Sequence, residues 1–147
     1  PVEFDAATLT ALIDELRHTE EIPPDAVIVD MPDTLHFRFD PDHLRQILWN
    51  LLRNAWRYCR RQPGSIRFQG YASTEGLALD IVDDGPGISP DQLGKLFEPF
   101  ATTEAQGTGL GLFLARELAE ANHARLVHLP TPRGAGFRLD IFGGARA

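Results

Sequence analysis

Apolar residues recur at helical spacing in three parts of the chain. Residues 6–17 return to an apolar side chain every three or four positions, which predicts an amphipathic helix. These positions are Leu9, Leu12, Ile13 and Leu16. Residues 40–60 carry a longer stripe of the same kind, with Asp40 placed as an N-cap and Pro41 as the first helical residue. Residues 109–122 predict a third helix.

Shorter apolar runs bounded by turn residues predict six strands. They cover residues 26–31, 35–39, 65–71, 77–82, 126–129 and 136–142. A Pro32-Asp33 turn separates the first two strands, and Thr74-Glu75-Gly76 joins the next two. Residues 83–108 predict instead a long ordered loop, with a short helix after Ser89-Pro90. Such a loop inside a compact domain is usually functional, for example as a lid.

The composition fits one domain with its own core. The chain has 147 residues, of which 43% are hydrophobic, and a domain of this length buries roughly 68–70% of its unfolded surface. No apolar run approaches the ~20 residues of a membrane span. The single cysteine, Cys59, excludes a disulfide framework and a cysteine-based zinc site. The net charge of −7 argues against nonspecific nucleic-acid binding, which requires clustered basic residues.

Four polar residues share one face of the predicted helix 40–60. Asn50, Asn54, Arg57 and Tyr58 follow one another at i, i+4, i+7 and i+8, beside the apolar stripe. An Asn amide oxygen is a suitable neutral ligand for Mg²⁺, and the planar fork of an Arg can meet a phosphate. The alternative is a helix whose polar residues merely flank the apolar stripe and bind no ligand.

Asp83 lies directly after an apolar strand and before Gly85 and Gly87. A partly buried carboxylate needs a hydrogen-bond donor, and the exocyclic amine of a purine is one such donor. The alternative is an ordinary turn, because Asp-Gly is a common turn dipeptide.

Two further segments could take part in binding. Glycines in 107–112 precede a helix, where free N–H groups and the helix dipole can face a phosphate. Their spacing matches neither the dinucleotide fingerprint nor the P-loop. In residues 96–100, Phe97 and Phe100 lie in the predicted lid, where each needs an apolar surface to pack against. The alternative is that they simply fill a small satellite core.

Together and in this order, these four segments resemble the catalytic and ATP-binding domain of sensor histidine kinases, in the superfamily shared with gyrase, Hsp90 and MutL. The N box resembles residues 42–58, the G1 box 83–88, the F box 96–100 and the G2 box 107–112. The resemblance implies an α/β (α+β) two-layer sandwich of the Bergerat type, in which helices cover one face of a mixed sheet.

The resemblance also implies residue roles. Asn54 would ligate Mg²⁺, Asp83 would accept the adenine amine, and residues 89–106 would form the ATP lid. Asn50 and Arg57 would be the catalytic candidates. The implied ATP-contacting residues are Asn50, Asn54, Arg57, Tyr58, Asp83, Gly85, Gly87, Ile88, Phe100, Thr103, Gly107, Thr108, Gly109, Leu110, Gly111 and Leu112.

Asn50 distinguishes branches of this superfamily. The ATP-hydrolysing members carry Glu one turn before the metal-binding Asn, and Asn50 in that place cannot accept a proton. The resemblance therefore implies a histidine kinase, whose imidazole nucleophile is usable when neutral, with catalysis by positioning and charge stabilisation. A conformational ATPase of the gyrase/Hsp90 type and a non-catalytic binding module are the alternatives.

The chain lacks an initiator Met and is expected to be a piece of a longer protein. Residues 1–20 are expected to be a linker and first helix from a missing dimerisation and phosphoacceptor domain, and residues 21–147 the catalytic domain. His18 is not expected to be the phosphoacceptor, because its neighbours Thr19 and Glu21 depart from the family pattern. The implied partners are the missing domain and a response regulator, without nucleic acid. The isolated domain is expected to be a cytoplasmic monomer, from a homodimeric parent that the inner membrane could anchor.

Overall fold

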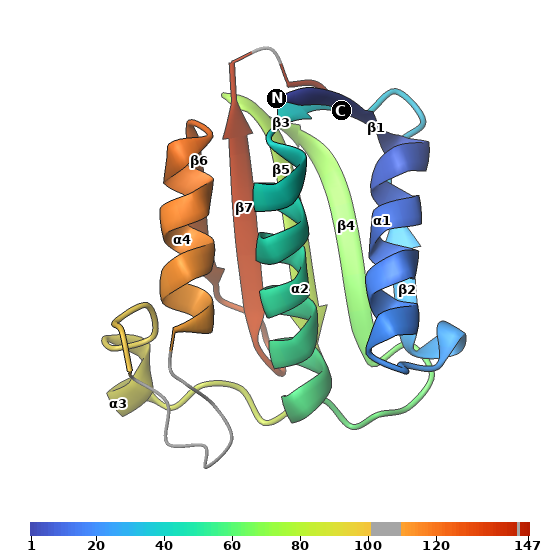
Figure 1. The fold of residues 1–147 in the computed structure, drawn as a ribbon. Helices are drawn as coiled ribbons and strands as arrows, with labels where there is room; N and C mark the ends of the chain where they lie inside the picture. The colour runs from blue at the N-terminus through green and yellow to red at the C-terminus, as the bar shows by residue number, and fades with distance from the viewer. Residues whose placement is uncertain (101–109, 144) are drawn as a thin grey trace.

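A computed structural model describes residues 1–100, 110–143 and 145–147 (Figure 1). Its centre is a five-stranded sheet in which β2 pairs with β4 in parallel and the other neighbours are antiparallel. In spatial order the strands are β2 (Val27–Asp30), β4 (Ile66–Ser73), β5 (Gly76–Asp83), β7 (Gly136–Phe142) and β6 (Ala124–Leu129). The sheet is therefore mixed, as expected.

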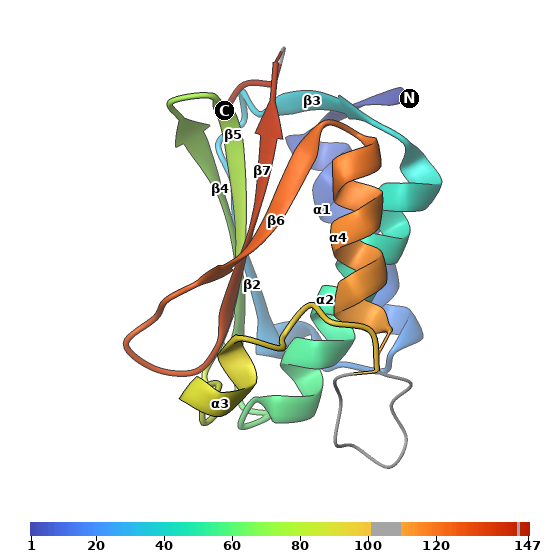
Figure 2. The same cartoon turned by 90° about the vertical axis from the view of Figure 1, so that its left-hand side faces the viewer.

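Three helices cover one face of this sheet, as the view along the sheet in Figure 2 shows. They are α1 (Ala6–Thr19), α2 (Pro41–Tyr58) and α4 (Gly111–Ala121). Two short helices, η1 (Pro24–Ala26) and α3 (Pro90–Leu93), lie in the connections. The two-layer α+β sandwich predicted from the sequence is confirmed.

The apolar stripe of α2 forms the middle of the core. Six side chains of this helix are buried, and each buried Leu or Ile contributes roughly 1.5–3 kcal/mol to folding. Asp40 caps the helix as predicted, because its Oδ1 accepts hydrogen bonds from the backbone N–H groups of Asp42 (2.9 Å) and His43 (3.0 Å).

The strand pairing near the N-terminus differs from a simple hairpin. β3 (His36–Phe39) does not pair with β2 across the predicted turn; it pairs with β1 (Val2–Asp5), a strand that sequence reasoning missed. The ring of Phe4 stacks on Phe37, with 5.4 Å between centroids. β1 carries only two apolar residues, Val2 and Phe4, and no turn residues set it apart from the helix that follows, so it was not recognisable in the sequence.

Residues 1–20 pack with the rest of the domain. The predicted apolar positions of α1 are buried in the same core cluster as those of α2, and β1 joins the small sheet. Residues 1–20 are thus part of the folded domain. That they also connect this domain to a dimerisation and phosphoacceptor domain stays a prediction. Among the described residues, no helix is long and apolar enough to cross a membrane.

Candidate functional site

The polar face of α2 meets the start of α4 at Asn50. The Nδ2 atom of Asn50 is buried and has no hydrogen-bond partner within the described part of the chain, a situation that costs about 1–3 kcal/mol. A Cβ added to Gly111, the first residue of α4, would lie 3.1 Å from Asn50 Oδ1. The backbone of α4 therefore approaches this amide closely, and an unpaired buried donor remains beside it.

The neighbours of Asn50 on this face are progressively more open. Asn54, one turn further along, is half-buried, whereas Arg57 and Tyr58 near the end of α2 are exposed. The predicted face thus exists, and it runs from Asn50, which is half-buried with a buried Nδ2 atom, to the exposed end of the helix.

Asp83 is the last residue of β5 and is only 5% exposed. Its Oδ1 accepts hydrogen bonds from the backbone N–H of Gly85 (2.8 Å) and of Ala135 (3.3 Å). Burial raises the pKa of this carboxyl, and it outweighs the lowering by these two hydrogen bonds. Among the described residues, no donor is recorded at Oδ2, so this oxygen remains available to a ligand.

Two glycines allow the backbone around Asp83 to close up. A Cβ on Gly85 would collide with the carbonyl oxygen of Tyr58, and a Cβ on Gly134 (φ 74°) would collide with that of Asp83. The loop after β5 therefore packs directly against the end of α2 and the β6–β7 turn. The predicted N-box and G1-box segments consequently meet in space.

The two phenylalanines of the F box have different surroundings. Phe97 packs edge-on against Phe137 of β7, with 6.1 Å between centroids, and the guanidinium of Arg116 lies 5.0 Å from the centre of the Phe97 ring. Phe100 is 73% exposed and has a φ of 62°. Phe97 thus packs against the main core rather than a satellite core, whereas Phe100 points into the solvent.

Comparison with known proteins identifies the family. Residues 39–142 match the family described as histidine kinase-, DNA gyrase B- and HSP90-like ATPases. The chain belongs to this family. It is 45% identical to the sensor protein kinase PilS of Pseudomonas aeruginosa in an alignment 109 residues long, which covers 69% of this chain and 20% of PilS. The chain spans about a fifth to a quarter of the length of such curated relatives.

Solved structures agree with this assignment. The nucleotide-free catalytic domain of histidine kinase ThkA superposes with a TM-score of 0.77 at 25% identity, over 96% of each chain. Full-length ShkA in complex with AMPPNP gives a TM-score of 0.71 at 25% identity, over 95% of this chain and 31% of ShkA. The resemblance to sensor histidine kinase catalytic domains is confirmed, and with it the nucleotide-binding class.

The structure of this ATPase-family domain brings most predicted site segments together. Ile88 and Leu112 are half-buried and pack against the core, and Leu110 is the N-cap residue of α4. The backbone of Gly87 (φ 83°) passes close to Gly134, whose oxygen would lie 3.1 Å from an added Cβ. Four predicted positions lie outside the described residues: Thr103, Gly107, Thr108 and Gly109.

Asp84 is a structural residue of the site that sequence reasoning missed. Its Oδ1 accepts a hydrogen bond from the backbone N–H of Arg60 (2.8 Å), and its Oδ2 accepts one from the Ser65 hydroxyl (2.9 Å). Burial acts to raise the pKa of Asp84, but these hydrogen bonds prevail and lower it. Asp84 therefore fixes the chain leaving α2 against the segment that carries Asp83. Nothing in the sequence beyond the doubled Asp marks this role.

A surface hollow of about 350 Å³ lies elsewhere, between α1 and β2. Its lining includes Ala11, Ile13, Pro24 and Val29. None of the predicted site residues lines it, and it is separate from the site described above.

Proposed function

We propose that this domain binds Mg-ATP and transfers the γ-phosphoryl group to a histidine on a separate dimerisation and phosphoacceptor domain, for relay to a response regulator. The observation that carries the proposal is the polar face of α2. Asn50, whose Nδ2 atom is buried and has no hydrogen-bond partner among the described residues, lies one turn before Asn54. The only acidic residue of α2 is Asp42, in its first turn. The helix therefore offers no carboxylate beside Asn54 to activate water, which suits a nucleophile that needs no base.

Asp83 would recognise the adenine base. Its free Oδ2 can accept a hydrogen bond from an exocyclic amine, while Oδ1 is held in place by Gly85 and Ala135. The backbone of Tyr58 leaves no room for a side chain at Gly85, and the positive φ of Gly87 (83°) disfavours one there. Ile88 and Tyr58 would complete the surroundings of the base and sugar.

Asn54 and Arg57 would serve the phosphate end. The amide oxygen of Asn54 would bind Mg²⁺ together with phosphate oxygens and water, as this ion prefers. When bound, the ion supplies charge neutralisation on the phosphate oxygens. Arg57, which makes no ion pair within the described part of the chain, would add a second positive charge, and the buried N–H of Asn50 would donate to a phosphate oxygen. Gly107, Thr108, Gly109, Leu110, Gly111 and Leu112 would present backbone N–H groups.

The exposed Phe100 would contact the phosphoacceptor domain. A phenylalanine that is 73% exposed gains more by docking than by remaining hydrated. The partners in this proposal are that domain and a response regulator, and an inner-membrane anchor would belong to the parent protein.

Two measurements test the proposed function. Calorimetry with ADP should show binding that strengthens with magnesium, and incubation with labelled ATP and the separately produced phosphoacceptor domain should label its histidine. Asp30→Asn, an exposed carboxylate remote from the site, provides a control that should leave both unchanged. Steady ATP hydrolysis without any acceptor would favour a conformational ATPase instead, and no ADP binding at millimolar concentration would favour a non-catalytic module.

A further inference from the structure

The outer side of α2 carries alternating tryptophan and arginine side chains. Trp49, Arg53 and Trp56 follow at spacings of four and three residues, so they lie on one helix face. Arg61 follows just beyond the helix end and returns to this face through Trp56. We call these four residues the arginine–tryptophan surface.

Each arginine of this surface is stacked on a tryptophan. The guanidinium carbon of Arg53 lies 4.7 Å from the ring centre of Trp49, and that of Arg61 lies 4.9 Å from the ring centre of Trp56. The Nε of Arg61 also donates to the carbonyl oxygen of Trp56 (3.3 Å). Stacking of this kind stabilises a fixed guanidinium position, and groups held in place lose less entropy when a partner binds.

Glu20 holds the upstream pair in place. Its Oε1 accepts a hydrogen bond from Trp49 Nε1 (2.8 Å) and forms an ion pair with Arg53 Nε (3.1 Å). The side chain of Arg53 nevertheless keeps 45% of its surface exposed. Its terminal nitrogens therefore remain accessible to a second carboxylate.

The charge around this surface is opposite to that of the whole protein. Five of the 14 basic residues fall within positions 45–61: Arg45, Arg53, Arg57, Arg60 and Arg61. Carboxylates of α1 and of the residue after it pair with Arg45 and Arg53, but no ion pair within the described residues involves the other three. In a chain of net charge −7, this is a concentrated positive patch.

We propose that the arginine–tryptophan surface docks an acidic helix of a partner protein. The two tryptophans on which the guanidinium groups stack are seven residues apart, about 10 Å along the helix axis, so two carboxylates separated by two helical turns on the partner match this spacing. Arg and Trp are the side chains most enriched at the energetic centres of protein interfaces. Both indoles are half-buried against the core and contacted by guanidinium groups, which favours a protein partner over a lipid bilayer.

Intrinsic fluorescence tests this proposal directly, because Trp49 and Trp56 are the only two tryptophans of the chain. The probe is a tryptophan-free, alanine-rich helical peptide with glutamate pairs two turns apart, compared with a peptide of the same composition in which the glutamates are adjacent. The spaced peptide should change the fluorescence and bind about tenfold more tightly than the adjacent one. Binding should weaken at about 1 M NaCl, where the Debye length is about 3 Å.

Paired variants separate docking from general electrostatics. Arg53→Gln with Arg61→Gln should weaken peptide binding about tenfold while ADP affinity and the unfolding midpoint stay close to wild type, so this proposal can fail independently of the proposed function. Arg67→Gln with Arg125→Gln, which removes two exposed arginines elsewhere, should bind like wild type. Equal binding of both peptides, an unchanged Arg53/Arg61 variant, a response only to anionic phosphatidylglycerol vesicles, or self-association through this face in sedimentation would each overturn the proposal.

Discussion

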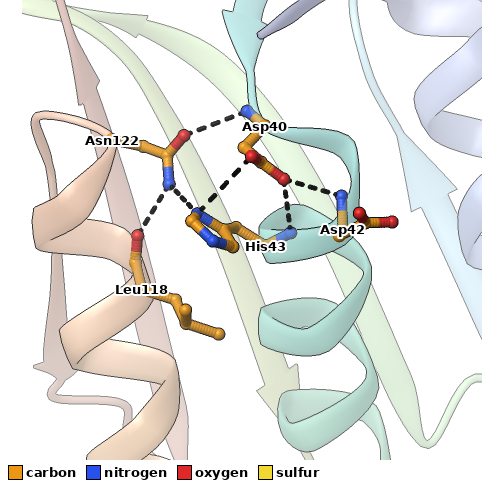
Figure 3. A network of polar contacts seen from close by, with 5 residues as sticks. All are labelled: Asp40, Asp42, His43, Leu118 and Asn122. Carbon is orange, nitrogen blue, oxygen red and sulfur yellow. Dashed lines mark hydrogen bonds and ion pairs between the residues drawn. The ribbon is translucent and has the colours of Figure 1, made fainter.

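The side chain of Asn122 joins the end of α4 to the start of α2 by accepting a hydrogen bond from the backbone N–H of Asp40, with 2.9 Å between Oδ1 and N (Figure 3). Its Nδ2 donates to the carbonyl oxygen of Leu118 (2.8 Å) and lies 2.9 Å from Nδ1 of His43. Since Nδ2 is a donor, Nδ1 must act as the acceptor, and the neutral imidazole carries its proton on Nε2. One amide thus satisfies groups on two helices that are distant in sequence.

Asn122→Ala should lower the free energy of unfolding by about 1–3 kcal/mol, because it leaves the partly buried N–H of Asp40 without an acceptor. Asn122→Asp retains an acceptor for Asp40 but loses the donor to Leu118 and His43. Its free energy of unfolding at neutral pH should therefore lie between those of Asn122→Ala and wild type. Urea denaturation measures both. An alanine variant as stable as wild type would mean that water replaces this contact.

Asp83→Asn should separate stability from binding. Burial raises the pKa of Asp83 above its usual value of 3.8, so the folded state binds this proton more readily than the unfolded state. The ionised form therefore costs stability at neutral pH, and this cost disappears as the pH falls through the raised pKa. The amide variant should be at least as stable as wild type at pH 7, and its stability should lose this pH dependence.

The same variant should bind ADP roughly 10- to 100-fold more weakly, because a charged acceptor is replaced by a group that presents a donor to the adenine amine. Calorimetry at pH 7 and denaturation between pH 3 and 8 give the two readouts. Unchanged ADP affinity would remove Asp83 from the binding site.

Asp84 should show the opposite pH behaviour to Asp83. Hydrogen bonds from Arg60 and Ser65 lower its pKa against the effect of burial, so it stabilises the fold at pH values above its unfolded pKa. Asp84→Ala should cost about 1–2 kcal/mol at pH 7, and the difference from wild type should shrink as the pH falls below about 4. Denaturation curves at several pH values check this, and a difference that stays constant would show that the carboxylate charge is irrelevant.

Phe97→Ala and Phe100→Ala form a matched pair within one short segment. Phe97 loses contacts with Phe137 and Arg116, so its truncation should lower the free energy of unfolding by about 1–3 kcal/mol. Phe100 is exposed, so its truncation should leave stability within about 0.5 kcal/mol of wild type and slow phosphoryl transfer to the phosphoacceptor domain. Thermal unfolding and transfer assays on both variants distinguish packing from docking, and normal transfer by Phe100→Ala would reject the docking role.

The sequence predicted the elements with long, regular patterns and missed those defined by contacts between distant segments. The helix Pro41–Tyr58 could be predicted because its apolar positions recur at helical spacing from Leu44 to Ala55, over about three turns. The pairing of β3 with β1, and the parallel pairing of β2 with β4, could not be predicted because strand partners are chosen by the packing of the whole domain.

The site divides in the same way. The residues that the motifs marked, Asn50, Asn54 and Asp83, lie on the elements expected for them. The residues that hold these elements together, Asp84 and Asn122, act through backbone groups of Arg60 and Asp40. A contact to a backbone N–H does not depend on which residue carries that group, so the sequence does not mark it. The roles of Asp84 and Asn122 are therefore visible only in the structure.

Asn54→Asp tests the proposed metal position. A carboxylate in place of the amide adds a negative charge at a half-buried position of α2, and hard divalent cations bind carboxylates more strongly than amides. The magnesium concentration that gives half-maximal ADP binding should therefore fall, and binding without magnesium should weaken because the new charge repels the phosphates. Asn122→Asp introduces the same change at the C-terminal end of α4, whereas the site lies at the N-terminal end of that helix. This control should leave the magnesium dependence unchanged. If both variants titrate like wild type, Asn54 does not contact the ion, and the phosphate end of the site must be built from other residues.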